Sequence, residues 1–405
     1  MTRPLIIDSF AGGGGASTGI EMALGRGPDI AINHNAAALA LHAANHPDTL
    51  HLDSNIWGVD PRTVAAGRPV GLLWASPDCF PAGTLVLTSE GYRPIEEVVE
   101  GDLVLTHRGR WRPVTALMSG SKATVTIRAQ GHPGLTCSDG HKFWARRTKH
   151  SIPDWVPAGD LDRGSYLASP RMVEPLPRPD LDGVALAPEF WWIVGRYLAD
   201  GWADAKRGLI LTVGRTKADA TAAVLDRSGL RWTRRETETA VQFTTYNAAL
   251  CRWLHRHFGH LAQGKRIPGW VLGMPEADRR RLLTGYVDGD GYRHGGLTET
   301  SSGSAALAYG LRSLCETLGF TCRVYLGENR VSVIDGRTIR PNLPAYQLRY
   351  RERVSDRHRQ TAEDALHRWY PVRAIESAGE QTVYNITVDE DHSYVVDGIV
   401  AKNCT

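Results

Sequence analysis

The stretch CFPAGTLVLTSEGYRPIEEVVEGDLVLT at residues 79–106 indicates a fold more directly than any other part of the sequence. It contains the short apolar runs TLVLT and DLVLT, and a third run, ATVTIRA, follows at residues 123–129. Runs of this length that are rich in Val, Thr and Ile and separated by glycine turns are typical of β-strands. The sequence therefore predicts an all-β unit that begins at Cys79.

The size and composition of the chain limit the classes of protein to consider. A chain of 405 residues is expected to form two or three domains. Its apolar fraction of 42% and charged fraction of 22% are typical of a folded protein in water, and no run approaches the roughly 20 apolar residues of a membrane span. Membrane proteins and disordered chains are thereby excluded. The N-terminus lacks the features of a secretory signal, so the cytoplasm is the expected compartment.

The cysteines and the net charge say less about the class of protein than its size and composition do. No two cysteines form a C-x-x-C pair, which argues against a disulfide framework and against a zinc site. In a reducing compartment the cysteines are expected to be thiols. The net charge of +3 arises from 47 basic and 44 acidic residues, so it does not decide whether the chain binds nucleic acid. The six cysteines are at positions 79, 137, 251, 315, 322 and 404.

The segment before Cys79 alternates between strand-like and helix-like patterns. The apolar run LIID at residues 5–8 leads into glycines 12–15 and then into a helical stretch, and a second strand and helix follow. This alternation predicts a parallel, doubly wound α/β sheet. Glycine N–H groups at a helix N-terminus can approach a polar or anionic ligand closely, although a purely structural turn is an equal alternative.

Several elements of this first segment occur together in one known family. DSFAGGGGAS at residues 8–17, the polar cluster at 33–35, Asp53 and SPDC resemble the start of a DNA cytosine-5 methyltransferase. The resemblance covers residues 1–78 and implies an S-adenosylmethionine-binding fragment. It also implies that methylation requires the remainder of such an enzyme, and Asn33 stands where an acidic ribose ligand is usual. The matching cofactor-binding positions are Asp8, Phe10, Gly12, Gly14, Asn33 and Asp53.

After residue 78 the methyltransferase pattern stops, and the chain ends VYNITVDEDHSYVVDGIVAKNCT at residues 383–405. The two edges resemble the ends of an intein, a self-excising segment with an all-β Hint domain. The resemblance implies a splicing domain made from residues 79–175 and 366–403, with 404–405 as the start of the C-terminal extein. Removing the 325 residues between the edges would leave 80 residues that read WASPDCT across the junction, which restores the methyltransferase Pro-x-Cys element.

Self-excision requires nucleophiles that are already in place, because an amide bond is stable in water. By the resemblance, the Cys79 thiol attacks the preceding carbonyl, Cys404 accepts the acyl group, and the Asn403 side chain closes into a succinimide. Ser138 and His141 match a Thr-x-x-His block of inteins, with serine in place of threonine. They are expected to protonate the leaving nitrogen and to stabilise the oxyanion, so that splicing needs no cofactor.

Two positions depart from the intein pattern. The residue before the terminal asparagine is commonly histidine but is Lys402 here, and the usual VYD element has Asn385 in place of aspartate. His392 matches the other C-terminal histidine of the family and is expected to polarise the Asn403 carbonyl. Splicing is predicted, and its rate is left open.

An internal repeat lies between the two edges. Residues 193–201, IVGRYLADG, and 283–291, LTGYVDGDG, share their apolar positions, a central glycine and a final Asp-Gly. A repeat of this kind indicates two copies of one fold, and the pattern resembles the LAGLIDADG homing endonucleases. The resemblance implies an α+β endonuclease with a pseudo-twofold repeat at residues 180–353. The alternative is that each motif is a buried helix that ends at a glycine cap.

The repeat also suggests a catalytic centre. Asp200 and Asp290 are suited to hold Mg²⁺, which neutralises phosphate charge and activates water. Helices that pack through Gly195 and Gly285 would bring both carboxylates together. Lys265 matches a basic position that the family places near the scissile phosphates, with a solvated loop lysine as the alternative.

Double-stranded DNA is the expected partner of the endonuclease, which is predicted to be a monomer. Strands within residues 230–246 and 322–351 would present basic side chains to a groove, although a solvated basic face is the alternative. Two further hypotheses concern the whole insertion: it acts only as an endonuclease without splicing, or it is a DNA-binding module of the methyltransferase. The candidate groove-facing residues are Arg231, Arg234, Arg235, Arg323, Arg330, Arg349 and Arg351.

Overall fold

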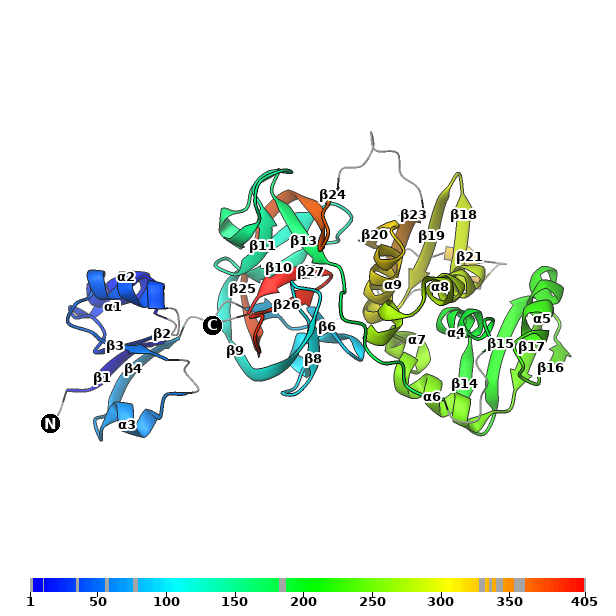
Figure 1. The fold of residues 1–405 in the computed structure, drawn as a ribbon, viewed down its shortest axis with the longest axis horizontal. Coiled ribbons are helices and arrows are strands. Elements are labelled where there is room, and N and C mark those ends of the chain that lie inside the picture. Colours follow the sequence, from blue (N-terminus) through cyan, green and yellow to red (C-terminus); the bar gives the residue numbers. More distant parts are fainter. Residues whose placement is uncertain are drawn as a thin grey trace.

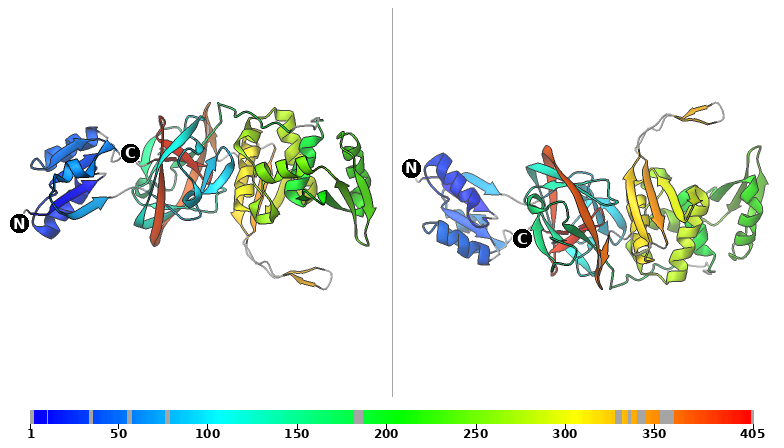
Figure 2. Two further views of the ribbon diagram at one scale, coloured as in Figure 1. Left: turned by 90° about the horizontal axis from the view of Figure 1, so that it is seen from below. Right: turned by 90° about the horizontal axis from the view of Figure 1, so that it is seen from above.

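The computed structural model describes residues 3–9, 11–33, 36–54, 58–75, 79–181, 187–327, 332–334, 337–339, 345–352 and 361–403. Phe10, Cys404 and Arg330, which the sequence singles out, lie outside these ranges. Figures 1 and 2 show a parallel sheet at the N-terminal end, then a β unit, then an α+β unit. The expected multidomain architecture is therefore confirmed in its broad outline.

The N-terminal sheet is parallel, as the alternating sequence pattern predicts, and its strand order is β3-β2-β1-β4. Figure 1 shows α1 and α2 on one face of this sheet and α3 on the other. The strand order reverses between β1 and β4, and open α/β sheets bind ligands beside such a reversal, at the carboxyl ends of the strands. The elements are β1 (Leu5–Ser9), α1 (Gly15–Leu24), β2 (Ile30–Asn33), α2 (Ala36–Asn45), β3 (Leu50–Asp53), α3 (Pro61–Ala65) and β4 (Val70–Ala75).

The β unit is built from two segments that are far apart in the sequence. Its longest strands, β9 (Trp111–Ala129) and β25 (His367–Val388), pair antiparallel with each other along most of their lengths. Apolar side chains from both segments share one buried core. The prediction of an all-β unit is thus confirmed. Its other strands are β5 (Phe80–Pro81), β6 (Leu85–Thr88), β7 (Gly91–Pro94), β8 (Leu103–Leu105), β10 (Leu135–Ser138), β11 (Lys142–Arg146), β12 (Asp154–Pro157), β13 (Tyr166–Pro170), β24 (Ala362–Glu363), β26 (Ser393–Val396) and β27 (Ile399–Lys402).

Strands β26 and β27 form a hairpin whose turn is Asp397-Gly398. Both turn residues have positive φ angles, 47° and 81°, and a two-residue hairpin turn of this kind favours Asp-Gly. The turn fixes a register in which Ser393 pairs with Lys402. The hairpin therefore returns the chain end to the level of the residues just before β26.

The α+β unit contains the same succession of elements twice. In each half, a helix is followed by a hairpin, a second helix and another pair of strands. The strand orders β14-β15-β17-β16 and β18-β19-β23-β20 correspond position by position. The elements are α4 (Phe190–Ala199), β14 (Trp202–Asp204), β15 (Gly208–Gly214), α5 (Ala218–Asp226), β16 (Thr233–Glu236), β17 (Ala240–Thr245), α6 (Ala248–Phe258), α7 (Leu261–Gly264), α8 (Glu276–Asp290), β18 (Gly291–His294), β19 (Leu297–Ser302), α9 (Ala305–Thr317), β20 (Thr321–Leu326), β21 (Ser332–Ile334), β22 (Arg337–Ile339) and β23 (Tyr346–Arg351).

Helices α4 and α8 touch backbone to backbone. A Cβ atom at Gly195 would overlap the Leu282 carbonyl of α8, and one at Gly285 would overlap the Trp192 carbonyl of α4. Only glycine permits this approach, as the sequence comparison of the two motifs suggests. The described ranges contain no helix with the length and apolar composition needed to cross a membrane.

Candidate functional site

The first predicted nucleophile lies in a buried backbone contact between β5 and β10. Cys79 is 0% exposed. Its N–H donates to Ser138 Oγ at 2.9 Å, and the Ser138 N–H donates to the Cys79 carbonyl at 2.9 Å. The Ser138 hydroxyl therefore accepts a hydrogen bond from the nitrogen of the Asp78–Cys79 bond. Asp78 itself lies outside the described residues.

His141 is held close to the same bond by the turn that follows β10. Its N–H donates to the Ser138 carbonyl at 3.0 Å. The His141 ring is fully buried, with its centroid 4.2 Å from that of Phe80 and 5.4 Å from that of Phe143. The arrangement puts a hydroxyl on the Cys79 amide and an imidazole against the ring of the next residue, Phe80, so both groups are candidates to transfer a proton to a leaving nitrogen.

Asn403 follows β27 and is 3% exposed. Its backbone N–H donates to the His392 carbonyl at 3.0 Å, and its side-chain Nδ2 donates to the Val388 carbonyl at 3.3 Å. Within the described residues, Asn403 Oδ1 is buried without a hydrogen-bond partner. The side-chain amide is thus oriented by β25, through the Nδ2 atom that would act as nucleophile.

His392 contacts Asn403 through its backbone. The side chain is exposed. It is the backbone carbonyl of His392 that contacts Asn403. The expected action of the imidazole on the Asn403 carbonyl therefore stays a prediction.

The two ends of the predicted insert are brought to one aromatic cluster. The Phe80 ring, next to Cys79, lies 6.1 Å from Phe143 and 6.0 Å from Tyr394, measured between centroids. Phe143 and Tyr394 both pair with Ala401, two residues before Asn403. The Tyr394 hydroxyl also donates to Asn385 Oδ1 at 2.7 Å, which connects the departure from the VYD element to this cluster.

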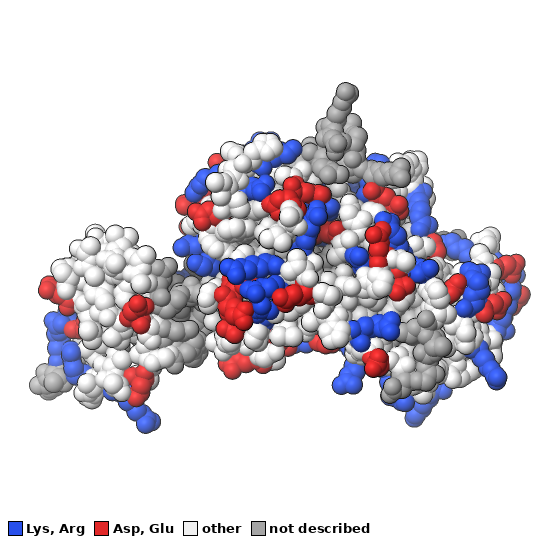
Figure 3. All heavy atoms as spheres, in the orientation of Figure 1, with Lys and Arg blue, Asp and Glu red and all other residues white. Residues whose placement is uncertain are grey.

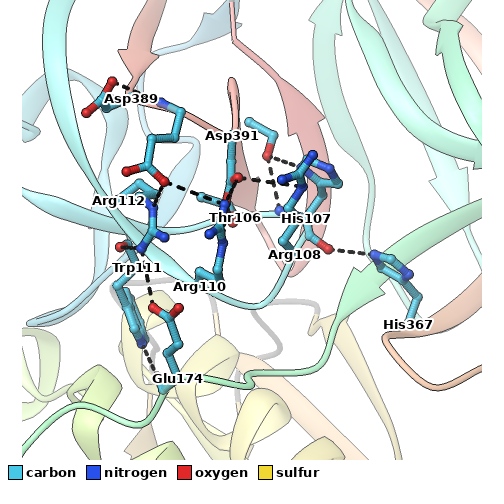
Figure 4. Close-up of polar contacts among 12 residues, drawn as sticks. Thr106, His107, Arg108, Arg110, Trp111, Arg112, Glu174, His367, Asp389 and Asp391 are labelled. Atoms are coloured by element: carbon cyan, nitrogen blue, oxygen red, sulfur yellow. Dashed lines mark hydrogen bonds and ion pairs between the residues drawn. The ribbon is translucent and has the colours of Figure 1, made fainter.

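A polar network behind the β26–β27 hairpin was not foreseen from the sequence. Figure 4 shows Thr106 and Arg110, from the turn between β8 and β9, around the Asp391 carboxylate. Thr106 Oγ1 donates to Asp391 at 2.7 Å, and Arg110 forms an ion pair with it. His107 Nδ1 is 2.7 Å from Ser393 Oγ, and His367 Nε2 is 2.7 Å from the His107 carbonyl. Side chains more than 250 residues apart thus fix the start of β26.

Replacing Asp391 with asparagine should destabilise the β unit. Burial alone would raise the pKa of Asp391, but hydrogen bonds from Arg110 and Thr106 outweigh it and hold the pKa below its usual value. The stabilisation is therefore present above the unfolded carboxyl pKa of about 4 and is lost as the pH falls through the lower, folded value. At neutral pH the melting temperature should fall by roughly 5 °C, because Arg110 loses its partner.

Thermal melts from pH 3 to pH 8 measure this effect. The gap between wild type and Asp391→Asn should narrow below pH 4. Glu390→Gln is the matched control. The Glu390 side chain, next to Asp391 in the sequence, is 56% exposed, so its substitution should change the melting temperature little. Equal melting temperatures for Asp391→Asn and wild type at neutral pH would contradict the assigned role.

The second candidate centre lies where α4 and α8 end. Asp200 and Asp290 influence each other electrostatically, and burial raises the pKa of both carboxyls. Lys265 lies in their field and is 5% exposed, so it is not a solvated loop lysine. Burial lowers the pKa of Lys265 to about 8, against the opposing effect of the two aspartates. The three predicted residues are therefore close together.

The contacts of Lys265 differ from those that phosphate binding would need. Its Nζ donates to the carbonyls of Tyr197, Gly201 and Ala199 at 2.6, 3.0 and 3.4 Å. These carbonyls terminate α4, so the ammonium caps that helix and fixes the backbone on both sides of Asp200. An ammonium has three N–H donors, and the carbonyls engage all of them.

Arg196 is a member of this centre that the sequence analysis missed. Its guanidinium is 3% exposed, and its Nη2 lies 2.9 Å from Asp200 Oδ2. The four-residue spacing on one helix could have indicated the pair. Among the described residues, no cluster of three or more His, Cys, Asp or Glu side chains could hold a metal ion.

The basic side chains are arranged differently on the two sheets of the α+β unit. Arg323, Arg349 and Arg351 alternate with buried residues and share one face of the sheet. In the other half, Arg234 pairs with Asp219 and approaches the Phe243 ring, whereas Arg235 is on the opposite face. Figure 3 shows basic and acidic side chains interspersed over the visible surface. The shared basic face is therefore confined to β20 and β23.

At the N-terminal sheet, the predicted cofactor residues gather at the carboxyl ends of the strands. Asp8 is buried in β1, and Asn33 is opposite Asp53 at the ends of β2 and β3. Ser17 Oγ donates to Asp8 Oδ2 at 2.6 Å, and burial raises the pKa of this carboxyl. Asp8 Oδ1 has no partner within the described residues.

The glycine loop has the geometry that the sequence suggests. Gly14 has a φ of 100° and precedes α1 without any side-chain cap. A Cβ at Gly12 would meet no heavy atom within 4 Å, so the loop is open on that side. These features leave backbone N–H groups available at the start of α1.

Comparisons with known proteins identify part of the chain. Residues 78–136 match the family model of the Hint domain. The iron-sulfur cluster assembly SufBD family protein Rv1461 of Mycobacterium tuberculosis is 28% identical over 371 residues, which cover 81% of this chain and 43% of that protein. The ATP-dependent DNA helicase Hel308 of Thermococcus kodakarensis is 24% identical over 405 residues, which cover 80% and 36%. The chain therefore matches less than half the length of these relatives.

Solved structures overlay only loosely. A DnaB intein from Synechocystis has a TM-score of 0.30 and 7% identity, over 81% of this chain and 99% of its own. Mesophilic variants of the homing endonuclease I-DmoI have a TM-score of 0.30 and 10% identity, over 42% and 89%. These TM-scores are too low to establish a shared fold. On the strength of the family match, the chain contains a Hint domain.

Proposed function

We propose that residues 79–403 are an intein that excises itself and joins its flanking segments. The observation that carries the proposal is the hydrogen bond from the Cys79 N–H to Ser138 Oγ, with the His141 ring packed against that of the next residue, Phe80. A hydroxyl and an imidazole at the nitrogen of a buried Xaa–Cys bond favour attack by the cysteine on the preceding carbonyl. The Hint match supports the same interpretation.

The first step converts an amide into a thioester. Cys79 Sγ forms a bond with the Asp78 carbonyl carbon, the C–N bond breaks, and the Cys79 nitrogen leaves as an amine after it receives a proton. Ser138 Oγ, which accepts the amide N–H in the resting chain, and His141 are the groups placed to deliver that proton. The step needs no external reagent.

The later steps use the other end of the segment. Cys404 attacks the thioester and takes the acyl group, which releases the Cys79 thiol. Asn403 Nδ2 then attacks its own carbonyl carbon, which breaks the Asn403–Cys404 bond and leaves a succinimide. The Val388 carbonyl orients Nδ2 for this attack. A final transfer of the acyl group from sulfur to the Cys404 nitrogen gives an ordinary peptide bond.

Replacing Ser138 with alanine should slow thioester formation by roughly tenfold or more, since the leaving nitrogen loses the hydroxyl that contacts it. Ser138→Thr keeps the hydroxyl and should stay near the wild-type rate. The rate is measured in an Asn403→Ala background as the release of residues 1–78 by an added small thiol. Thr136→Ala removes a nearby hydroxyl from the same strand and serves as control. An unchanged rate in Ser138→Ala would exclude this role.

The relatives support an insertion that is independent of its host. One is named for iron-sulfur cluster assembly and the other as a DNA helicase, yet each aligns with about four fifths of this chain. Residues 79–403 are also about four fifths of the chain. Alignments of that extent with proteins of different names are expected of a chain that is largely a mobile element.

We further propose that the α+β unit is a DNA endonuclease of the LAGLIDADG type. The repeated topology, the contact of α4 with α8 through glycines, and the adjacent Asp200 and Asp290 carboxylates support it. Two carboxylates are hard oxygen donors that fit Mg²⁺, and the ion would neutralise phosphate charge and activate water there. Lys265 fixes the end of α4, and the arginines of β20 and β23 would bind the DNA backbone.

The flanking fragment fits a host that binds S-adenosylmethionine. The open glycine loop, the uncapped start of α1 and the unpartnered Asp8 oxygen suit a polar ligand, with Asn33 and Asp53 on the neighbouring strand ends. We propose on these grounds that residues 1–78 and 404–405 belong to a DNA cytosine-5 methyltransferase. The cofactor would bind to these side chains and N–H groups and would supply the methyl group.

A further inference from the structure

Arg196 lies where it can act on both candidate metal ligands. Its Nη2 is 2.9 Å from Asp200 Oδ2, and its charge also acts on Asp290. With Lys265, it sets two buried cations beside the two carboxylates, and Lys217 adds a further positive charge that acts on Asp290. A divalent cation bound at Asp200 would face the guanidinium at close range.

The second helix is shaped to admit this guanidinium. A Cβ atom at Gly289 would lie 2.5 Å from Arg196 Nη1 and 2.5 Å from Ala199 Cβ. Glycine at this position, rather than a residue with a side chain, therefore leaves room for Arg196 between the ends of α4 and α8. The Trp192 ring lies 5.9 Å from the guanidinium carbon and closes another side of the space.

We propose that Arg196 is a resident competitor of the divalent cation, so that metal binding requires the Arg196–Asp200 ion pair to open. DNA favours this opening, because its phosphates provide an alternative partner for the guanidinium. The centre would thus bind the metal ion more tightly when DNA is bound. Arg196 is a positioning residue in this scheme, and the inference rests on the proposed endonuclease.

The direct test is Mn²⁺ binding to the full chain without DNA, followed by electron paramagnetic resonance. Arg196→Met removes the charge and keeps much of the volume, and it should lower the Kd for Mn²⁺ by about tenfold or more. Arg196→Lys keeps the charge and should stay within about twofold of wild type. Arg227→Met removes a partly exposed arginine that pairs with Glu189 at the other end of α4, and it controls for net charge.

A second variant guards against a folding defect in Arg196→Met. Gly289→Ala should push the guanidinium aside without removing its charge, and it should also tighten Mn²⁺ binding. Unchanged Kd values in both variants, with binding weakened by Asp290→Asn, would overturn the role of Arg196 while leaving the metal centre intact. Binding that Asp200→Asn and Asp290→Asn both leave unchanged would instead overturn the proposed endonuclease centre. Tighter binding in both variants, lost on Asp290→Asn, is the expected result.

Discussion

Replacing Cys79 with alanine is expected to abolish the thioester and all spliced product, whereas replacing Asn403 with alanine should block only release at the C-terminal junction. Cys79 directly follows Asp78 in the sequence and supplies the sulfur of the proposed first step, so its loss removes the first bond-forming step. Asn403→Ala keeps that step and loses the Nδ2 that contacts the Val388 carbonyl. The second variant should therefore accumulate branched chain and free residues 1–78.

Gel electrophoresis and intact-mass measurement of chains tagged at both ends distinguish these products. Cys137→Ala is a suitable control, since Cys137 is another buried thiol in the same unit and directly precedes Ser138 in β10. Identical product patterns for Cys79→Ala and Asn403→Ala would contradict the separate roles of the two residues.

Replacing Asp290 with asparagine should reduce magnesium-dependent double-strand cleavage by roughly 100-fold or more, since one of the two carboxylates proposed to bind metal is lost. The substrate is DNA of the gene without the insertion, in which the codons for WASPDCT are continuous. Splicing should be unaffected, because the Cys79 and Asn403 contacts all lie within the β unit. Cleavage is measured on linear DNA that carries this junction.

Asp288→Asn provides a matched control on the same helix. The Asp288 carboxylate accepts from Trp192 Nε1 at 2.9 Å and pairs with Arg293, so its substitution removes a charge from the same helix and leaves Asp200 and Asp290 in place. Asp288→Asn should retain most of its cleavage activity. Equal cleavage by Asp290→Asn and wild type would show that the paired motifs do not form a catalytic centre.

Short-range patterns were the ones that could be predicted from sequence. Short apolar runs predicted the β unit, and the alternation of strands and helices predicted the parallel sheet. The repeated motif predicted the two matching halves of the α+β unit. In each case the signal lies within a few residues, because strand and helix periodicities are local. The glycines at 195 and 285 were informative for the same reason: a missing side chain permits backbone contact.

Long-range pairing could not be predicted in this way. Nothing local in β9 or β25 specifies that they pair with each other, because their register is decided by the shared core. The network of Asp391 with Thr106 and Arg110 joins segments about 280 residues apart, and no sequence spacing encodes it. Lys265 was placed near the aspartates, but its contacts with the α4 carbonyls depend on how the loop folds.

The most direct test of self-excision is the mass of the products formed by the wild-type chain with a tag at each end. Self-excision predicts a free 325-residue segment beginning at Cys79 and ending at Asn403, together with a ligated product in which residue 78 is joined to Cys404. Tandem mass spectrometry should find the peptide WASPDCT in the ligated product. A single full-length species, with neither the excised segment nor this junction, would show that the chain does not excise itself.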